Sequence, residues 1–345
     1  MANSIELIKK HAAANLDKIF MMESRTGILE NRMGLELRPV ENDASIVYIP
    51  DLAMDGLGDY NRDTGFPEGD VDLKWTPYQV RKDRGRGFSI DKVVDMESAG
   101  ITSANLMTEF LRTQVIPEVD AYRLSVLAAN AHADNIKTET VAANKIISKF
   151  NDVIEQFTDD EIALDKLVLF ISAAIDKEIR NTTELAKKIT QTDYKVGNLT
   201  FKVRSYDDIP IVVVPKTRFK SSYIFGENGF APTTDTYALT EDETLVTGKT
   251  YYTKSDDKYT AVTEPNVANI ATYYEKVTSA AQDINFMVVH TSAALPYKKH
   301  EAVRVFAPEV NQKKDAWLFQ YRLYHDIFTP SKKQKGIYVS QKAAG

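Results

Sequence analysis

The feature that most constrains this fold is a long two-stranded excursion with a glycine-rich tip, at residues 46–92. Residues 44–52 have the β-branched, alternating character of a strand, and residues 71–91 bring the chain back. Between them, residues 54–70 carry four glycines and a proline, the composition of a loop tip. An isolated hairpin of this length cannot bury its own faces in water. The excursion therefore needs a partner surface, which the rest of the sequence does not obviously supply.

The return path contains a basic stretch, RKDRGRGFSID, at residues 81–91. Three interpretations stay open: a patch that neutralises nucleic-acid phosphates, a set of ion pairs with a neighbouring subunit, or a solvated strand edge. Asp83 and Asp91 interrupt the positive charge, and a net charge of −6 argues against a general nucleic-acid binder. The four basic residues are Arg81, Lys82, Arg84 and Arg86.

The sequence contains no recognisable catalytic or cofactor motif. It has no cysteine, which excludes disulfides, thiolate metal sites and cysteine nucleophiles. Its five histidines lie far apart, and none has the spacing of a metal site. We therefore expect no enzymatic activity, no cofactor and no metal. The longest apolar runs, such as residues 167–175, are too short to span a bilayer, so we expect no membrane association.

Helical periodicity is clearest in the first half of the chain. Residues 4–23 predict a helix whose apolar stripe is thin, so it needs another element or subunit to pack on. Residues 102–133 predict the longest helix, and Pro117 predicts a kink or a split there because proline removes one backbone hydrogen bond. From residue 140 the patterns alternate, as in a sheet covered by helices. The expected helices are 142–157 and 173–181, and the expected strands are 166–172 and a pair within 199–219 that turns at Asp207–Asp208.

Residues 233–279 differ in character from the sequence on either side. Thr and Tyr dominate, turn signals recur at short spacing, and core-like sequence resumes at 284–295. This composition predicts a small all-β insertion. Its tyrosines form either a surface recognition face or the core of the small domain; the candidates are Tyr251, Tyr252, Tyr273 and Tyr274. At the C-terminus, residues 317–341 predict two joined strands.

Several stretches, taken in order, resemble the major capsid proteins of tailed bacteriophages, which share the Hong Kong 97 fold. They cover nearly the whole chain apart from the insertion, and they are residues 56–75, 82–91, 109–125, 208–219, 285–295 and 321–339. The resemblance implies an α+β fold with an N-terminal arm, an extended hairpin called the E-loop, a P-domain with a long spine helix, and an A-domain that carries the all-β insertion. The implied boundaries are 1–45 for the N-terminal arm, 46–92 for the E-loop, 93–139 for the P-domain with its spine helix, 140–232 and 280–309 for the A-domain, 233–279 for the inserted domain, and 310–345 for the C-terminal strands of the P-domain.

The same resemblance implies a function and partners. The chain is expected to be a structural subunit that self-assembles into hexamers and pentamers of an icosahedral phage head, enclosing double-stranded DNA without sequence-specific binding. The head is expected to assemble in the bacterial cytoplasm, with scaffolding, portal and decoration proteins as further partners. The candidates for contacts between subunits are the four basic residues of 81–86 and, at the hairpin tip, Gly56, Gly58, Tyr60 and Arg62.

Two other functions stay open at this point. The first alternative is a binding or adhesion protein that acts through the Tyr/Thr-rich insertion, with the rest of the chain as its scaffold. The second alternative is an encapsulin-like shell, which shares the capsid architecture and encloses enzyme cargo in place of DNA. No long segment precedes the first expected helix, so within the capsid family the resemblance implies a separate scaffolding protein or none.

Overall fold

The computed structural model describes residues 23–30, 38–39, 45–63, 65–93, 101–142, 145–181, 189–196, 199–242, 244–246, 249–255 and 258–343. The helix expected at 4–23, and most of the expected N-terminal arm, lie outside these residues. The chain forms two compact units, which we call unit 1 (residues 1–116, 193–202 and 290–336) and unit 2 (residues 117–192, 203–289 and 337–345). The domain boundaries expected from the sequence remain predictions. Short 3-10 turns occur at Gly27–Leu29, Ala133–Asn135, Leu164–Lys166, Lys216–Arg218, Thr291–Ala293 and Ser331–Gly336.

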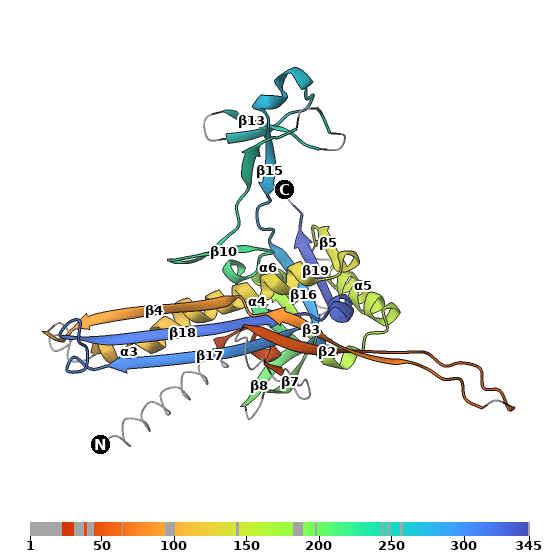
Figure 1. The fold of residues 1–345 in the computed structure, drawn as a ribbon, viewed down its shortest axis with the longest axis horizontal. Coiled ribbons are helices and arrows are strands. Elements are labelled where there is room, and N and C mark those ends of the chain that lie inside the picture. Colours follow the sequence, from red (N-terminus) through yellow and green to blue (C-terminus); the bar gives the residue numbers. More distant parts are fainter. Residues whose placement is uncertain are drawn as a thin grey trace. The chain divides into compact units, whose positions relative to one another are not determined.

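Unit 1 contains a long antiparallel sheet of three strands, in the order β17-β18-β4 (Figure 1). The strands are β17 (Leu295–Phe306), β18 (Ala316–Phe328) and β4 (Lys82–Asp91). Their register places Phe88 of β4 opposite Phe319 of β18. The aromatic ring of Phe110, at the end of α3 (Ile101–Phe110), lies edge-on to Phe88 and Tyr321, with ring centroids 4.9 and 6.0 Å away. Helix α3 therefore packs against one face of this sheet.

The excursion at 46–92 consists of a hairpin followed by a separate strand. The hairpin is formed by β2 (Ile46–Met54) and β3 (Val71–Gln79), and β1 (Arg38–Pro39) pairs with the base of β2. The return path expected as one strand is interrupted at Val80, and β4 then pairs with β18 near the C-terminus. The expectation of no intrachain partner is therefore wrong for β4 and for the hairpin base. At that base, five buried residues form an apolar cluster: Val47, Ile49, Val80, Leu295 and Phe328.

The long helix expected at 102–133 consists of three consecutive parts. Helix α3 continues into a π-helical turn, η2 (Leu111–Val115), and then into α4 (Ile116–Asn130). In the π-helical turn the N–H of Ile116 donates to the carbonyl of Leu111, five residues back. Pro117 has no N–H to donate to the carbonyl of Thr113, so an α-helical bond is missing at this point. The wider turn accommodates the proline, where the sequence predicted a kink or a split.

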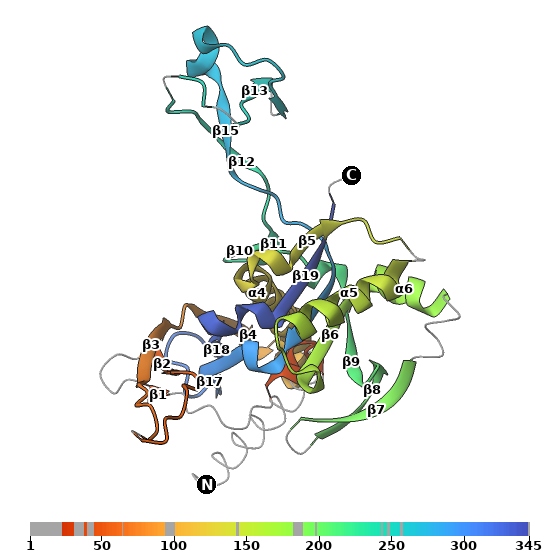
Figure 2. The same cartoon turned by 90° about the vertical axis from the view of Figure 1, so that its right-hand side faces the viewer.

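Most of unit 2 is built on a mixed sheet of strand order β5-β19-β16-β6-β9-β8-β7, in which residues 193–202 of β7 and β8 count with unit 1, and helix α5 packs on this sheet (Figure 2). The strands are β5 (Ile136–Glu139), β6 (Leu167–Ser172), β7 (Ile189–Val196), β8 (Leu199–Tyr206), β9 (Ile209–Val214), β16 (Ile284–His290) and β19 (Ile337–Lys342). The helices are α5 (Ile146–Asp159) and α6 (Ala173–Asn181). Phe150 of α5 meets Phe286 of β16 edge-on, with centroids 5.2 Å apart, inside the core.

Several local expectations for unit 2 are confirmed, and one about the C-terminus is wrong. The expected helices and strands from 142 to 219 are present, and the turn between β8 and β9 has positive φ at Asp207 and Asp208. Asp tolerates this left-handed conformation better than most residues, which explains its position there. The two C-terminal strands, however, are not paired with each other. β18 pairs with β17 and β4, whereas β19 pairs with β16 and, in parallel, with β5.

The insertion is all-β, as expected. Its sheet has the order β12-β15-β13-β14, and a short two-stranded sheet of β10 and β11 precedes it. The elements are β10 (Tyr223–Gly226), β11 (Gly229–Pro232), β12 (Thr236–Leu239), β13 (Tyr252–Ser255), β14 (Lys258–Ala261), the 3-10 helix η7 (Val267–Thr272) and β15 (Tyr274–Thr278). Tyr251 and Tyr273 are 1% and 4% exposed and form the small core with Ile270. Of the two alternatives left open for the tyrosines, burial favours the core of the small domain for these two and contradicts a place on a surface recognition face.

Candidate assembly surfaces

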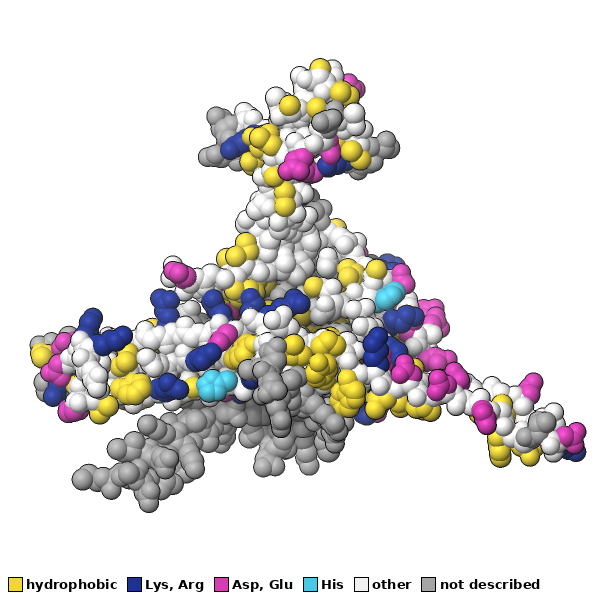
Figure 3. Space-filling model, viewed as in Figure 1, with side chains coloured by type: hydrophobic (Ala, Val, Ile, Leu, Met, Phe, Trp, Pro, Cys, Tyr) yellow, Lys and Arg dark blue, Asp and Glu magenta, His cyan; other side chains and the backbone are white. Residues whose placement is uncertain are grey.

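The distal half of the β2–β3 hairpin has one apolar face. The register pairs Pro50 with Trp75, Leu52 with Leu73, and Met54 with Val71, and directly paired residues point to the same side of a hairpin. We call Leu52, Met54, Val71 and Leu73 the apolar hairpin face; their exposed fractions are 51, 67, 62 and 53%. Figure 3 shows hydrophobic side chains at the surface of this extension. Contiguous exposed apolar surface of this kind is typical of an interaction site.

The tip of the hairpin is ordered by its own contacts. Asn61 and Gly65 form an isolated β-bridge, and Gly65 has φ +88°, which a side chain would strain. The rings of Tyr60 and Phe66 meet edge-on, with centroids 4.9 Å apart, although both remain exposed. A Cβ at Gly58 would lie 2.9 Å from the Cγ of Pro67, so the close approach of these two chain segments requires glycine.

The hairpin tip is also acidic. Residues 51–74 contain seven carboxylates and only two basic side chains, Arg62 and Lys74. Two of the carboxylates make contacts within unit 1: Asp51 pairs with Lys332 at 2.8 Å, and Asp55 accepts a hydrogen bond from the backbone N–H of Asp70. Of the tip residues predicted from the sequence, Gly56, Gly58, Tyr60 and Arg62 are all exposed.

The four basic residues of 81–86 do not form one patch. Arg81 precedes β4, and its backbone N–H donates to the carboxylate of Asp326 at 2.8 Å. Along β4 successive side chains alternate between faces, so Lys82, Arg84 and Arg86 share the face that carries Phe88. Asp83, Gly85 and Gly87 lie on the opposite face.

That opposite face of the sheet carries a shallow groove of about 370 Å³. Gly85, Gly87 and Ala302 line its floor, because none of them has a side chain beyond Cβ. A Cβ at Gly85 would lie 2.9 Å from the carbonyl oxygen of Tyr321, so the β4–β18 approach requires glycine. The charged and polar side chains of the lining are those of Asp83, His300, Arg304, Gln320 and Arg322. Arg86 also borders the groove, but its side chain lies on the other face of the sheet. We call this the glycine groove; Figure 3 shows Lys and Arg side chains along the strands of this sheet.

Positive charge dominates the glycine groove. Arg322 binds Asp83 through two hydrogen bonds, the one from Nε to Oδ1 being 2.9 Å long. The hydrogen bond from Arg322 holds the pKa of Asp83 below its usual value, so this one carboxylate stays charged and engaged with Arg322. The side chain of Arg304 lines the groove in addition to that of Arg322, so two arginines face the single carboxylate of Asp83. The groove therefore suits carboxylate or phosphate groups.

Comparisons with known proteins identify the fold. No protein-family model and no curated protein matches the sequence. Solved structures do match: a chain of Gordonia phage Cozz aligns with 94% of this chain and 87% of its own, at 11% identity and a TM-score of 0.51. A chain from the capsid structure of the cyanophage P-SCSP1u aligns with 92% of this chain and 91% of its own, at 9% identity and a TM-score of 0.50.

The chain has a phage capsid fold. The expected Hong Kong 97-type fold class, with an all-β insertion, is thereby confirmed. The β2–β3 hairpin lies within the residues where the E-loop was expected, and the α3–η2–α4 helix lies within residues 93–139, where the P-domain with its spine helix was expected. None of the helices in the described residues is long and apolar enough to cross a membrane. No cluster of three or more His, Asp or Glu side chains that could hold a metal ion occurs among those residues.

In the inserted domain, the two remaining tyrosine candidates also pack against other rings. Tyr252 and Tyr274 are paired across β13 and β15, on the face opposite the buried Tyr251 and Tyr273. Tyr237 and Tyr259 stack with their planes 11° apart and centroids 4.1 Å apart, and they contact Tyr252 and Tyr274 respectively. The amino group of Lys276 lies over the rings of Tyr237 and Tyr252. These half-buried tyrosines therefore stabilise the small sheet through one another.

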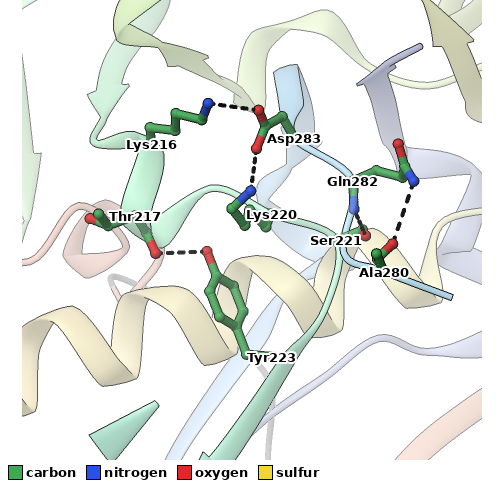
Figure 4. A network of polar contacts seen from close by, with 8 residues as sticks. All are labelled: Lys216, Thr217, Lys220, Ser221, Tyr223, Ala280, Gln282 and Asp283. Carbon is green, nitrogen blue, oxygen red and sulfur yellow. Dashed lines mark hydrogen bonds and ion pairs between the residues drawn. The ribbon is translucent and has the colours of Figure 1, made fainter. Parts of the chain in front are cut away.

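The root of the insertion is held by a polar network (Figure 4). The carboxylate of Asp283 pairs with the amino groups of Lys220 and, at 3.1 Å, Lys216. Burial alone would raise the pKa of Asp283, but the hydrogen bonds from the two lysines hold it below its usual value. Backbone and side-chain hydrogen bonds join Ser221 to Gln282, both 2.9 Å long. The segment that enters the insertion (216–221) and the segment that leaves it (282–283) are thus joined to each other at its root.

Sequence reasoning located the hairpin tip and missed the glycine groove. The groove combines residues of β4 with residues of β17 and β18, which lie more than 200 positions later in the sequence. The only local signal is the Gly-Arg-Gly at 85–87, and two glycines in a strand do not by themselves indicate a groove. Only the pairing of β4 with β18 shows that these glycines form a groove floor.

Proposed function

We propose that this chain is a major capsid protein, the structural subunit that self-assembles into hexamers and pentamers of an icosahedral phage head around double-stranded DNA. The observation that carries the proposal is the apolar hairpin face, presented on a phage capsid fold. Within the described residues this face has no apolar cluster to pack on, whereas the hairpin base does. A second copy of the chain is the partner that a repeating shell supplies.

The energy available from the apolar hairpin face supports this proposal. Burying a whole Leu, Val or Met side chain stabilises by roughly 1.5–3 kcal/mol. The four side chains are half to two-thirds exposed, so covering them contributes about 4–6 kcal/mol per contact. Trp75 extends this face toward the hairpin base, and the exposed side chains of Leu57 and Phe66 add further apolar area at the tip. This is an appreciable fraction of what a specific interface needs, and a closed shell repeats it at every subunit.

Charge complementarity indicates a binding site for the hairpin tip. The tip carries an excess of carboxylates, and the glycine groove carries an excess of arginines. We place the acidic tip of one subunit at the glycine groove of the next, where Arg304 can bind a carboxylate while Arg322 stays engaged with Asp83. The groove floor of glycine and alanine allows another chain to approach the sheet closely. Such a contact weakens as salt screens the charges.

The same proposal includes further partners in assembly, and the structure bears on the two alternative functions. Scaffolding, portal and decoration proteins are partners in assembly, the virion is the location, and the subunit has no enzymatic role. Burial of Tyr251 and Tyr273 removes two of the four residues that an adhesion function would use. An encapsulin-like shell would use the same contacts, so the enclosed cargo distinguishes it from a phage head.

Electron microscopy and sedimentation of the purified protein test the proposal. We expect closed shells, formed by the protein alone or with a scaffolding protein, and nucleic acid inside particles recovered from infected cells. Shells filled with enzyme and free of nucleic acid would favour the encapsulin-like alternative. A protein that stays monomeric at every ionic strength, with and without scaffolding protein, would contradict the proposal.

A further inference from the structure

The turn between β10 and β11 contains an asparagine followed by glycine, Asn228–Gly229, and no other asparagine of the sequence precedes a glycine. We propose that Asn228 is a site of spontaneous covalent modification, at which deamidation converts it to aspartate or isoaspartate. This inference is independent of the proposed function. It rests on the exposure of the turn, its backbone conformation and the absence of restraint on the asparagine side chain.

The reaction requires only water. The amide nitrogen of Gly229 attacks Cγ of Asn228, a ring imide forms, and the side-chain nitrogen leaves as ammonia. Water then adds to either carbonyl of the imide and reopens the ring, which gives an aspartyl or an isoaspartyl linkage. Glycine favours the attack because it has no Cβ to crowd the approach and because its backbone is the least restricted. Asparagine is accordingly one of the thermolabile residues.

The turn leaves Asn228 accessible and uncrowded. Asn228 is exposed, and the hairpin closes at the pair Gly226 and Gly229 with only two residues between them. Gly229 has φ +110°, and a Cβ at either glycine would meet nothing within 4 Å. The two strands form a sheet of their own with four residues each, and such a short hairpin opens easily at its tip.

Other asparagines provide a contrast within the same chain. The side-chain oxygens of Asn61, Asn266 and Asn311 each accept a hydrogen bond from a backbone N–H two residues later, at 2.8, 3.0 and 3.2 Å. The carboxamide of Asn228 makes no hydrogen bond to the described part of the chain. Its side chain is therefore free to rotate toward the Gly229 nitrogen, whereas the other three are held in their loops.

The modification is expected to change charge and to leave the fold intact. The strands of the hairpin are anchored by aromatic contacts: Phe225 meets Tyr122 of α4, and Tyr223 meets Phe230, both with ring centroids 5.5 Å apart. The hydroxyl of Tyr223 also donates to the carbonyl of Thr217. Deamidation adds one negative charge beside Glu227, in the exposed turn beyond the last of these paired residues, Phe225 and Phe230.

Peptide mapping by mass spectrometry tests the proposal. The purified full-length protein is incubated at mildly alkaline pH and 37 °C, folded or unfolded in urea, and each asparagine-containing peptide is followed over time. We expect Asn228 to convert faster than Asn61, Asn266 and Asn311 in the folded protein, and at a rate within about tenfold of that in the unfolded chain, because the tip opens locally. The Asn228→Gln variant, whose longer side chain forms a larger and less favoured ring, should lose this conversion and keep the thermal unfolding temperature. Conversion in urea with none in the folded protein over the same period would overturn the proposal, since the turn would then protect the site.

Discussion

Leu73→Asp places a charge in the centre of the apolar hairpin face. Leu73 lies on β3 directly opposite Leu52 and is 53% exposed. Because more than half of the side chain is already in water, the substitution should change the free energy of unfolding of the isolated subunit by only about 0.5 kcal/mol. Any larger effect should therefore arise in assembly.

The expected cost in assembly follows from the exposed area. Covering the exposed half of a leucine contributes about 1 kcal/mol, which the variant loses. Burying an aspartate without a partner costs a further 1–3 kcal/mol, roughly, because its carboxylate gives up hydrogen bonds to water. The total is about 2–4 kcal/mol per contact, which weakens each contact roughly 30- to 1,000-fold.

Light scattering and electron microscopy measure this effect as the protein concentration at which shells first appear. We expect that concentration to rise at least about 30-fold for Leu73→Asp, following the same conversion, while circular dichroism shows an unchanged unfolding temperature. Ala53→Asp is the matched control, since it introduces the same carboxylate and the same change of charge at the exposed residue next to Leu52, but on the other face of the hairpin. It should assemble like the parent chain. Equal assembly of Leu73→Asp and the parent would refute the assignment of this face as an interface.

Three further predictions concern the groove, the root of the insertion and the insertion itself. Arg304→Glu reverses a charge of the glycine groove and should slow shell formation most at low salt, with light scattering as the readout; a rate identical to the parent at low salt would contradict the proposed tip contact. Asp283→Asn should lower the free energy of unfolding by about 1–3 kcal/mol at neutral pH. Because folding lowers the pKa of Asp283, the carboxylate stabilises the fold above its ordinary pKa of 3.8, and this stabilisation is lost as the pH falls through the lower pKa of the folded state. The urea unfolding curves of variant and parent should therefore converge in acid, and a difference that persists in acid would contradict the ion-pair explanation. Replacing residues 233–279 by a short Gly-Ser link should leave a folded subunit, because Ser221 and Gln282 already join the two segments at 2.9 Å; circular dichroism and gel filtration check this, and aggregation at all temperatures would count against it.

Local sequence patterns determined much of the fold. Alternation and apolar runs located the hairpin, the helices α5 and α6 and the strand β6, because side-chain periodicity is a property of neighbouring residues. The change in composition at 233–279 marked the insertion for the same reason. Glycines and Asp207–Asp208 marked turns, since backbone sterics restrict which residues adopt left-handed conformations.

Tertiary structure alone decided which surfaces exist. The pairing of β4 with β18 joins residues more than 200 positions apart, and that pairing converts Gly85 and Gly87 into the floor of a groove. In the inserted domain, the tertiary structure likewise determined that Tyr251 is buried whereas its neighbour Tyr252 lies on the opposite face of the small sheet. The physical reason is that burial and long-range strand pairing depend on which distant segments come into contact. The local sequence of one segment does not specify its partner.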